Sequence, residues 1–249
     1  FANRKRHEAN RPDRARGRRD SAGGLRYPRA VVSAPSRRTA VVALALVAPA
    51  PTLGVCAAMV TFPGPLGQAL FAAAKLWLLA LPVLWHVRVE GGRPGWSPPG
   101  RGGLGAGLAV GLASAGAIGL AYWLLAARLD PAPLAAELVD VGLAHPARYL
   151  AGAAYWVLVN SVAEEYVFRW FVFRQCRALL PRWPAIVAAN LVFAAHHVLA
   201  VGLYLEPSLA ALASLAVFVG GCSWSWLYDR SGSILPGWLA HACADVAIF

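Results

Sequence analysis

Apolar stretches long enough to cross a bilayer recur along the 249-residue chain, and short polar or proline- and glycine-rich segments separate them. A helix needs about 20 consecutive apolar residues to span the hydrocarbon core of a membrane. The pattern predicts seven such helices, with expected ranges of 40–60, 66–87, 104–127, 149–173, 184–203, 208–228 and 234–249. The predicted fold class is all-α, a polytopic transmembrane helical bundle.

Composition supports a membrane protein and divides the chain in two. Hydrophobic residues make up 58% of the chain and charged residues only 14%, whereas about a quarter of a soluble domain is charged. Most of the net charge of +11 lies in residues 1–39. We interpret this segment as a disordered basic cytoplasmic tail, and not as a nucleic-acid-binding arm. Residues 40–249 are the predicted transmembrane domain, and no nucleic-acid partner is expected.

Basic residues in the short loops predict the orientation of the bundle, because cytoplasmic loops carry an excess of Lys and Arg. They follow the second, fourth and sixth spans: Arg88, Arg93, Arg101, Arg174, Arg177, Arg182 and Arg230. The loops on the other side carry the acidic residues Asp130, Glu137, Asp140 and Glu206. The N-terminus is therefore predicted to be cytoplasmic.

Three further features predict packing and not chemistry. The four cysteines lie apart, in or beside apolar stretches, which is typical of reduced, buried thiols. Small residues in the third span, such as Gly107 and Gly111, predict close helix contact. Lys75 lies inside the second span, where it either snorkels or faces the bundle, and the sequence assigns it no role.

Two adjacent glutamates lie within the fourth predicted span, in the sequence SVAEEYVFRWFVFRQ. An ionisable side chain inside a span costs about 2.5–3.5 kcal/mol on insertion scales and marks a functional candidate. Glu165 and Arg169 are four residues apart, the spacing of a helical ion pair. Glu164 is rotated by about 100° from its neighbour, and therefore needs another partner.

Two later spans each bring an imidazole at the same spacing. Phe193 and His197 share one helical face, and so do His241 and Asp245. Taken separately, His197 fits a satisfied core histidine, and His241 fits a local hydrogen bond to Asp245. Taken together, polar groups from three spans seek one another in lipid and predict a water-activating site.

These motifs resemble those of the CPBP intramembrane endopeptidases, the CAAX-protease and bacteriocin-processing (Abi) group. They are Glu164-Glu165-x-x-x-Arg169, Phe193-x-x-x-His197 and His241-x-x-x-Asp245, and they fall within residues 149–249. The resemblance implies an intramembrane glutamic-type endopeptidase that cleaves a peptide bond in or near the membrane. It makes residues 40–249 a transmembrane peptidase domain.

The resemblance also implies roles for single residues. Glu164 would be the general base, and His197 would help it to activate the attacking water. His241 and Asp245 would stabilise the oxyanion, while Glu165, Arg169 and Phe193 would support the site. Asp245 stands where Asn is common in the family. An ionised Asp cannot donate a hydrogen bond, so Asp245 is either protonated or acts on His241.

Several alternatives remain open at this point. Glu, two His and Asp also form a credible zinc set, although the sequence lacks HExxH and a Glu/His water site needs no cofactor. A serine rhomboid-type peptidase would use Ser161 or Ser231, neither of which stands in a GxSG-like context. A non-catalytic scaffold or immunity protein would use the carboxylates for packing. A proton-relaying transporter would show broken helices or inverted repeats, and neither is visible in the sequence.

Partners and location follow from the same features. The expected partners are the lipid bilayer and a peptide or membrane-anchored protein substrate, such as a leader peptide or a sorting anchor. A prenylated tail is less expected, because bacteria rarely need CAAX processing. The chain is rich in Ala, Gly, Arg and Trp, which indicates a high-GC bacterial coding sequence. We therefore expect an integral protein of the bacterial inner membrane.

Overall fold

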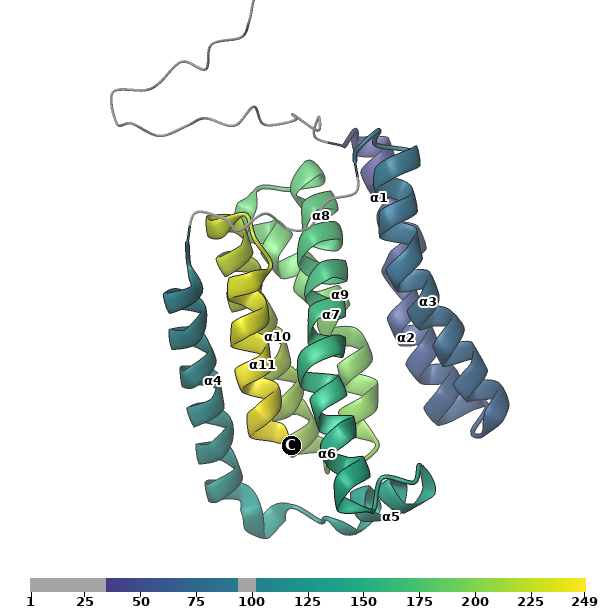
Figure 1. The fold of residues 1–249 in the computed structure, drawn as a ribbon, viewed down its shortest axis with the longest axis vertical. Coiled ribbons are helices and arrows are strands. Elements are labelled where there is room, and N and C mark those ends of the chain that lie inside the picture. The colour runs from purple at the N-terminus through teal and green to yellow at the C-terminus, as the bar shows by residue number, and fades with distance from the viewer. Residues whose placement is uncertain (1–34, 94–101) are drawn as a thin grey trace, which may run out of the picture. The chain divides into compact units, whose positions relative to one another are not determined.

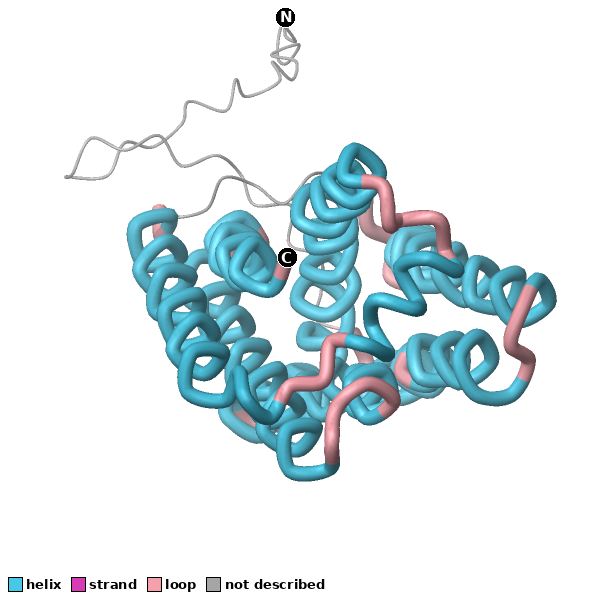
Figure 2. Tube along the Cα trace, turned by 90° about the horizontal axis from the view of Figure 1, so that it is seen from below, coloured by secondary structure: helices cyan, strands magenta, loops and turns pink. Residues whose placement is uncertain are grey.

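The computed structural model describes residues 35–93 and 102–249, and within these ranges it consists of helices and their connections (Figure 1, Figure 2). The all-α prediction is confirmed. Most of the predicted tail, residues 1–34, lies outside the described residues. In its described part, helix α1 already begins at Arg37, with the Ser36 hydroxyl accepting a hydrogen bond from the Thr39 amide at the helix start. The first helix is therefore slightly longer than predicted.

The N-terminal half contains three long helical stretches. The first runs through residues 37–61, the second is a single helix, and the third ends in a short 3-10 turn. Their elements are α1 (Arg37–Val47), α2 (Pro49–Cys56), the π-helical η1 (Ala57–Thr61), α3 (Pro65–Arg88), α4 (Leu104–Leu125) and η2 (Ala126–Arg128). The prolines at the starts of α2 and α3 occupy the first turn, where the missing N–H has no helical partner to lose.

The C-terminal half contains a short amphipathic helix followed by four longer helical stretches. The first of the four alternates between α- and π-helical geometry without a break from 146 to 179. The elements are α5 (Ala132–Asp140), α6 (Pro146–Tyr155), η3 (Trp156–Asn160), α7 (Ser161–Glu165), η4 (Tyr166–Phe173), α8 (Arg174–Leu179), α9 (Arg182–Gly202), α10 (Pro207–Ser231) and α11 (Leu235–Ile248). Each of the seven predicted spans therefore corresponds to a helical stretch.

Within the described residues, five of these stretches are long and apolar enough to cross a membrane. They are residues 37–61, α3, residues 104–128, α9 and α10. The other two predicted spans are not among these five, for two different physical reasons. The stretch 146–179 carries the charged candidate residues, and α11, at 14 residues, is about 21 Å long, shorter than the hydrocarbon core.

The stretch 146–179 is the element around which the others pack. It contacts α1, α3, α9, α10 and α11, while α4 packs along α11 (Figure 1). The α4–α11 contact depends on glycine. A Cβ at Gly107 would lie 2.4 Å from the Pro236 carbonyl oxygen, and one at Gly111 would lie 2.8 Å from the Cβ of Cys243. The predicted role of small residues in this span is confirmed at these two positions.

Apolar side chains face both inward and outward, as expected in a bilayer. Aromatic residues of the long central stretch, such as Phe171 and Phe173, are buried, whereas Tyr122 and Trp123 of α4 are 67% and 74% exposed. Exposed aromatic residues of this kind are enriched at the membrane–water interface. All four cysteines are free, but the burial that the sequence suggested holds only for Cys176, whereas Cys56, Cys222 and Cys243 are partly exposed.

A buried polar cluster ties the end of α3 to α8. Glu90 pairs with Arg174, accepts a hydrogen bond from the Gln175 amide at 2.7 Å, and lies 2.9 Å from the Nδ1 of His86. Burial alone raises the pKa of Glu90. The hydrogen bonds from His86 and Gln175 and the positive charge of Arg174 outweigh burial, so that the pKa lies below its ordinary value of 4.5. The carboxylate form therefore stabilises the folded chain.

We expect Glu90→Gln to lower the free energy of unfolding by about 2 kcal/mol at neutral pH, because Glu90 loses its charge-assisted hydrogen bond to the partly exposed Arg174. The folded state holds the pKa of Glu90 down, so its stabilisation is complete above the ordinary value and is lost as pH falls through the lowered one. The difference between wild type and variant should therefore shrink in acid. Thermal unfolding in detergent at a series of pH values measures it, with the exposed Glu137→Gln as control. A difference that does not change with pH would contradict this account.

Candidate functional site

Both glutamates of interest lie on α7, a single α-helical turn between two π-helical segments, η3 and η4. A π-helix bonds each amide to the carbonyl five residues back, which rotates the side chains that follow relative to an α-helix. Such segments are frequent at functional sites. The sequence pattern, interpreted with 3.6 residues per turn throughout, predicts none of this local change.

Glu165 and Arg169 form the predicted ion pair. The Nη1 of Arg169 lies 3.3 Å from the Oε1 of Glu165, and both side chains are fully buried. The guanidinium also stacks over the rings of Phe193 and Trp224, at 4.5 and 5.0 Å from their centroids. Its Nη2 donates to the Gly221 carbonyl at 3.4 Å. Arg169 thus joins η4 to α9 and α10.

Glu164 has a different environment. Its Oε1 accepts a hydrogen bond from the Nδ2 of Asn160 at 2.8 Å, and its Oε2 lies 3.8 Å from the Nε2 of His241. The side chain is 13% exposed, whereas that of Glu165 is fully buried. Glu164 is also within electrostatic range of the imidazoles of His196 and His197. Glu164 therefore has a partner of its own, Asn160, as the sequence predicted it would need, while both carboxylates approach His241.

His241 lies between carboxylates from two helices. Its Nδ1 donates to the Oε1 of Glu165 at 3.1 Å, because a carboxylate only accepts. Its Nε2 lies 3.6 Å from the Oδ1 of Asp245, and its ring stacks on Trp224 with centroids 4.0 Å apart. The Oδ2 of Asp245 is buried and has no hydrogen-bond partner within the described part of the chain. The Nε2 of His241 is therefore the nitrogen that faces Glu164 and Asp245.

His197 approaches the same cluster from α9. Its Nδ1 donates to the Phe193 carbonyl at 3.0 Å, since a carbonyl only accepts, and this leaves the Nε2 lone pair free. The buried Phe193 ring contacts both imidazoles, with centroids 4.7 Å from His197 and 6.2 Å from His241. His196 lies beside His197 and stacks on Phe168. Phe193 therefore separates and supports the two candidate histidines.

Two glycines leave room for this network. A Cβ at Gly237 of α11 would lie 2.6 Å from the Oε2 of Glu165. A Cβ at Gly221 of α10 would lie 2.4 Å from the Oδ1 of Asn190 and 3.2 Å from Arg169. Only glycine lets both helices approach the buried ion pair so closely.

The structure adds side chains to the site that the sequence analysis did not assign to it. Trp224 stacks on His241, and Asn190 donates to the Ser225 hydroxyl at 2.9 Å. Asn160 and Lys75 connect to Glu164 through hydrogen bonds. Asn160 lies four residues before Glu164, so the same spacing that singled out Arg169 would have found it. No sequence signal links Lys75 to this site, because the contact joins distant spans.

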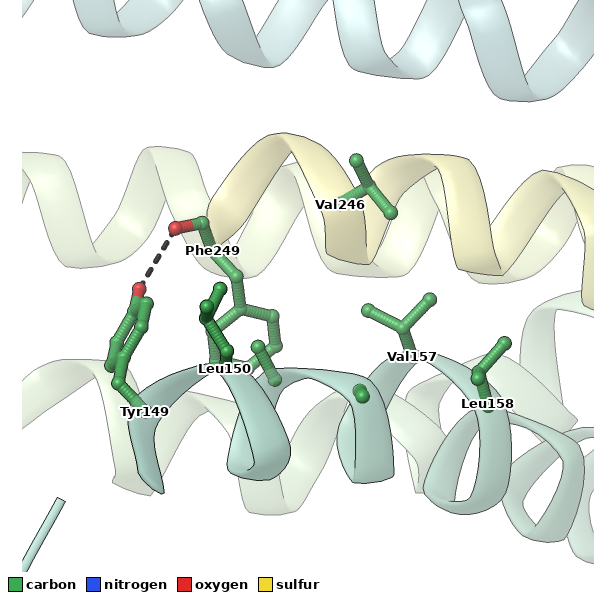
Figure 3. Close-up of a pocket in the computed structure, with 8 residues that line it drawn as sticks. Tyr149, Leu150, Val157, Leu158, Val246 and Phe249 are labelled. Atoms are coloured by element: carbon green, nitrogen blue, oxygen red, sulfur yellow. Dashed lines mark hydrogen bonds between the residues drawn. The ribbon is translucent and has the colours of Figure 1, made fainter. Parts of the chain in front are cut away.

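A separate apolar cavity of about 350 Å³ lies between α6–η3 and the end of α11 (Figure 3). It is lined by Tyr149, Leu150, Ala153, Ala154, Val157, Leu158, Val246 and Phe249. The Tyr149 hydroxyl donates to the main-chain oxygen of Phe249 at 2.8 Å. The lining includes no predicted catalytic residue, so this cavity is distinct from the polar cluster.

The cluster has the composition of a proton-transfer site. Within residues 35–93 and 102–249, no group of three or more His, Cys, Asp or Glu side chains is arranged to hold a metal ion. What the geometry does offer is a partly exposed carboxylate, a free imidazole lone pair and a second imidazole with one nitrogen unused by hydrogen bonding. These groups can accept and donate protons around a bound water molecule.

Comparison with protein families matches residues 146–247 to the family described as type II CAAX prenyl endopeptidase Rce1-like. The matched segment is about two fifths of the chain and contains every predicted site residue. The family resemblance expected from the motifs is thereby confirmed for this segment, and it indicates a membrane-embedded protease. Searches of curated proteins and of solved structures gave no match.

The two glutamates should respond differently to the same substitution. We expect Glu165→Gln to lower the free energy of unfolding by about 3–5 kcal/mol, because it leaves the fully buried Arg169 guanidinium without a counter-charge. Thermal or denaturant unfolding of the purified protein measures this loss. Glu137→Gln makes the same chemical change on exposed α5 and should stay within about 0.5 kcal/mol of wild type. Equal stability of the two variants would show that the ion pair does not stabilise the fold.

Proposed function

We propose that this protein is an intramembrane endopeptidase of the glutamic type, in which Glu164 and His197 activate a water molecule. The observation that carries the proposal is the state of the Glu164 carboxylate. One oxygen is held by Asn160, and the other has no hydrogen-bond partner within the described residues and lies 3.8 Å from the Nε2 of His241. A carboxylate with one oxygen oriented and one available suits a general base.

His197 supports the same role. Its Nδ1–H is engaged by the Phe193 carbonyl, so its Nε2 can accept a hydrogen bond from the attacking water. The water would then be oriented by one imidazole and deprotonated by one carboxylate. His196, with its ring against His197, adds no separate function to this proposal.

His241 is the proposed donor to the oxyanion. Its Nδ1 is fixed by Glu165, and its Nε2 lies 3.8 Å from the Oε2 of Glu164 and 3.6 Å from the Oδ1 of Asp245. The cluster holds three carboxylates against Arg169 and the nearby Lys75, so a second proton on His241 balances the charges. Asp245, near the Nε2, would act by holding that proton in place and not by donating itself.

The reaction follows from these positions. The water oxygen bonds to the scissile carbonyl carbon as Glu164 takes one water proton, and the resulting oxyanion accepts a hydrogen bond from the Nε2–H of His241. The tetrahedral intermediate then collapses, the C–N bond breaks, and the proton on Glu164 passes to the leaving amine. A donor aimed at the developing oxyanion contributes about 2.7–4 kcal/mol to catalysis in well-studied enzymes.

The family match supports a peptide substrate in general but does not identify its class. We propose a peptide or membrane-anchored protein that enters from the side where the stretch 146–179 ends at Arg174 and Arg177. The family description names CAAX prenyl endopeptidases, and the leader-peptide and sorting-anchor classes remain to be compared with a prenylated tail. A zinc-dependent peptidase and a non-catalytic scaffold are the alternatives, and the experiment below separates both.

Glu164→Gln should reduce kcat by about 10²-fold to 10⁴-fold while leaving the fold intact, because the amide keeps the shape and loses the base. The assay uses purified protein in lipid nanodiscs with fluorogenic peptides carrying a prenylated C-terminal tail, the same tail without the lipid, and a leader sequence. Metal analysis of the protein and assays in chelator test the zinc alternative.

Glu137→Gln serves as the matched control and should cleave at the wild-type rate. Cleavage by Glu164→Gln at the wild-type rate would overturn the glutamic mechanism. Loss of wild-type activity in chelator, restored by zinc, would favour the metalloprotease. No cleavage of any peptide by folded wild-type protein would favour the scaffold.

We also propose that the protein lies in the bacterial inner membrane with its N-terminus in the cytoplasm. Reporter fusions in a bacterial host test this orientation. Green fluorescent protein fused after residue 103 or 180 should fluoresce, and alkaline phosphatase fused after residue 130 or 205 should be active, because it needs the oxidising periplasm. Each point is fused to both reporters as a control. The reverse pattern would invert the orientation.

A further inference from the structure

A lysine from the N-terminal half reaches the candidate site. Lys75 lies in the middle of α3, and its Nζ donates to the Oδ1 of Asn160 at 2.6 Å. The ammonium also lies 5.6 and 5.7 Å from the ring centroids of Phe71 and Trp156. A lysine that snorkels to the membrane surface would extend away from the bundle. This one extends into it.

Asn160 relays the contact to Glu164. An ammonium only donates, so the Oδ1 of Asn160 faces Lys75, and the Nδ2 is left to donate to the Oε1 of Glu164 at 2.8 Å. The amide is therefore held in one orientation by a positive group on one side and a negative group on the other. The Asn160 side chain is buried, with its residue only 4% exposed. In a low-dielectric interior, hydrogen bonds of such a chain strengthen one another.

The other charged groups near Glu164 are either paired or are imidazoles and a carboxylate. The guanidinium of Arg169, which is fully buried beside the glutamates, is paired with Glu165. The remaining groups that face Glu164 are imidazoles from α9 and α11 and a carboxylate from α11: His196, His197, His241 and Asp245. Lys75 adds a basic group from α3, which is linked to Glu164 through Asn160.

We propose that Lys75 and Asn160 are positioning residues for Glu164: they keep its carboxylate ionised and hold one oxygen, so that the other faces the water. The proposal rests on the function proposed above. It extends the working site beyond the segment 146–247 that matches the family, because Lys75 comes from a helix outside that segment. The N-terminal half then contributes to the reaction as well as to packing.

The experiment measures kcat, KM and the pH dependence of kcat for Lys75→Met, Asn160→Leu and the double variant, all in nanodiscs. Lys75→Met should lower kcat by about 10- to 100-fold with KM little changed, because a displaced base reacts slowly. The acid limb of the pH profile should move to higher pH, since the carboxylate loses a positively charged neighbour. Above the pH of the acid limb, the kcat of the double variant should be no lower than that of Asn160→Leu, because Lys75 orients Glu164 through Asn160.

Two further variants separate charge from packing. Lys75→Arg keeps the charge and should recover most of the wild-type pH profile. Lys75→Gln keeps a donor for Asn160 without the charge, should shift the acid limb as Lys75→Met does, and is scored in its place if Lys75→Met fails to fold. Leu76→Met, on the exposed side of the same helix, introduces the same residue and should match wild type.

The outcomes distinguish this proposal from the one on which it rests. If Glu164→Gln is inactive while folded Lys75→Met and Lys75→Gln keep the wild-type kcat and pH profile, the relay is wrong and the glutamic mechanism stands. The relay would also be wrong if the losses of kcat in Lys75→Met and Asn160→Leu were equal and simply added in the double variant. If Glu164→Gln is fully active, the proposed function fails first, whatever Lys75 does.

Discussion

The fully buried ion pair between Glu165 and Arg169 is the interaction on which the site depends. Two charges removed from water are tolerated only where their geometry and further hydrogen bonds compensate for the lost hydration. Here Phe193 and Trp224 cover the guanidinium, His241 donates to the carboxylate, and Gly221 and Gly237 let two helices approach. The compensation is partial, because the Oε2 of Glu165 and the Nε and Nη1 of Arg169 have no hydrogen-bond partner within the described residues. Through these contacts the pair fixes η4, α9, α10 and α11 against one another.

This arrangement explains why the chain places two carboxylates side by side in an apolar helix. Glu165 has a structural role: its Oε1 lies against Arg169 and His241, and its buried Oε2 lies beside Gly237. Glu164, the preceding residue, is rotated by about 100° around the helix and remains partly exposed. A group that must exchange protons with a bound water cannot be held on every side, so stability and reactivity are assigned to different neighbours.

A feature could be predicted from the sequence when its contacting residues lie close together along the chain. The helical stretches and the Glu165–Arg169 pair are local, because apolar length and a spacing of four residues determine them, and both were predicted. The link between Lys75 and Asn160 joins residues 85 positions apart, so no local pattern shows it. The π-helical segments and the stacking of Trp224 on His241 also depend on tertiary packing. Sequence spacing predicted which carboxylate and imidazole side chains the structure brings together, but it did not predict how the spans meet.

A structure with a bound peptide phosphinate, which mimics the tetrahedral intermediate, would test the central claim most directly. The account predicts one phosphinate oxygen within about 2.6–3.2 Å of the Glu164 carboxylate and the other within the same range of the Nε2 of His241. Binding with the phosphinate held by a metal ion or by a serine hydroxyl, and with Glu164 out of reach, would contradict it.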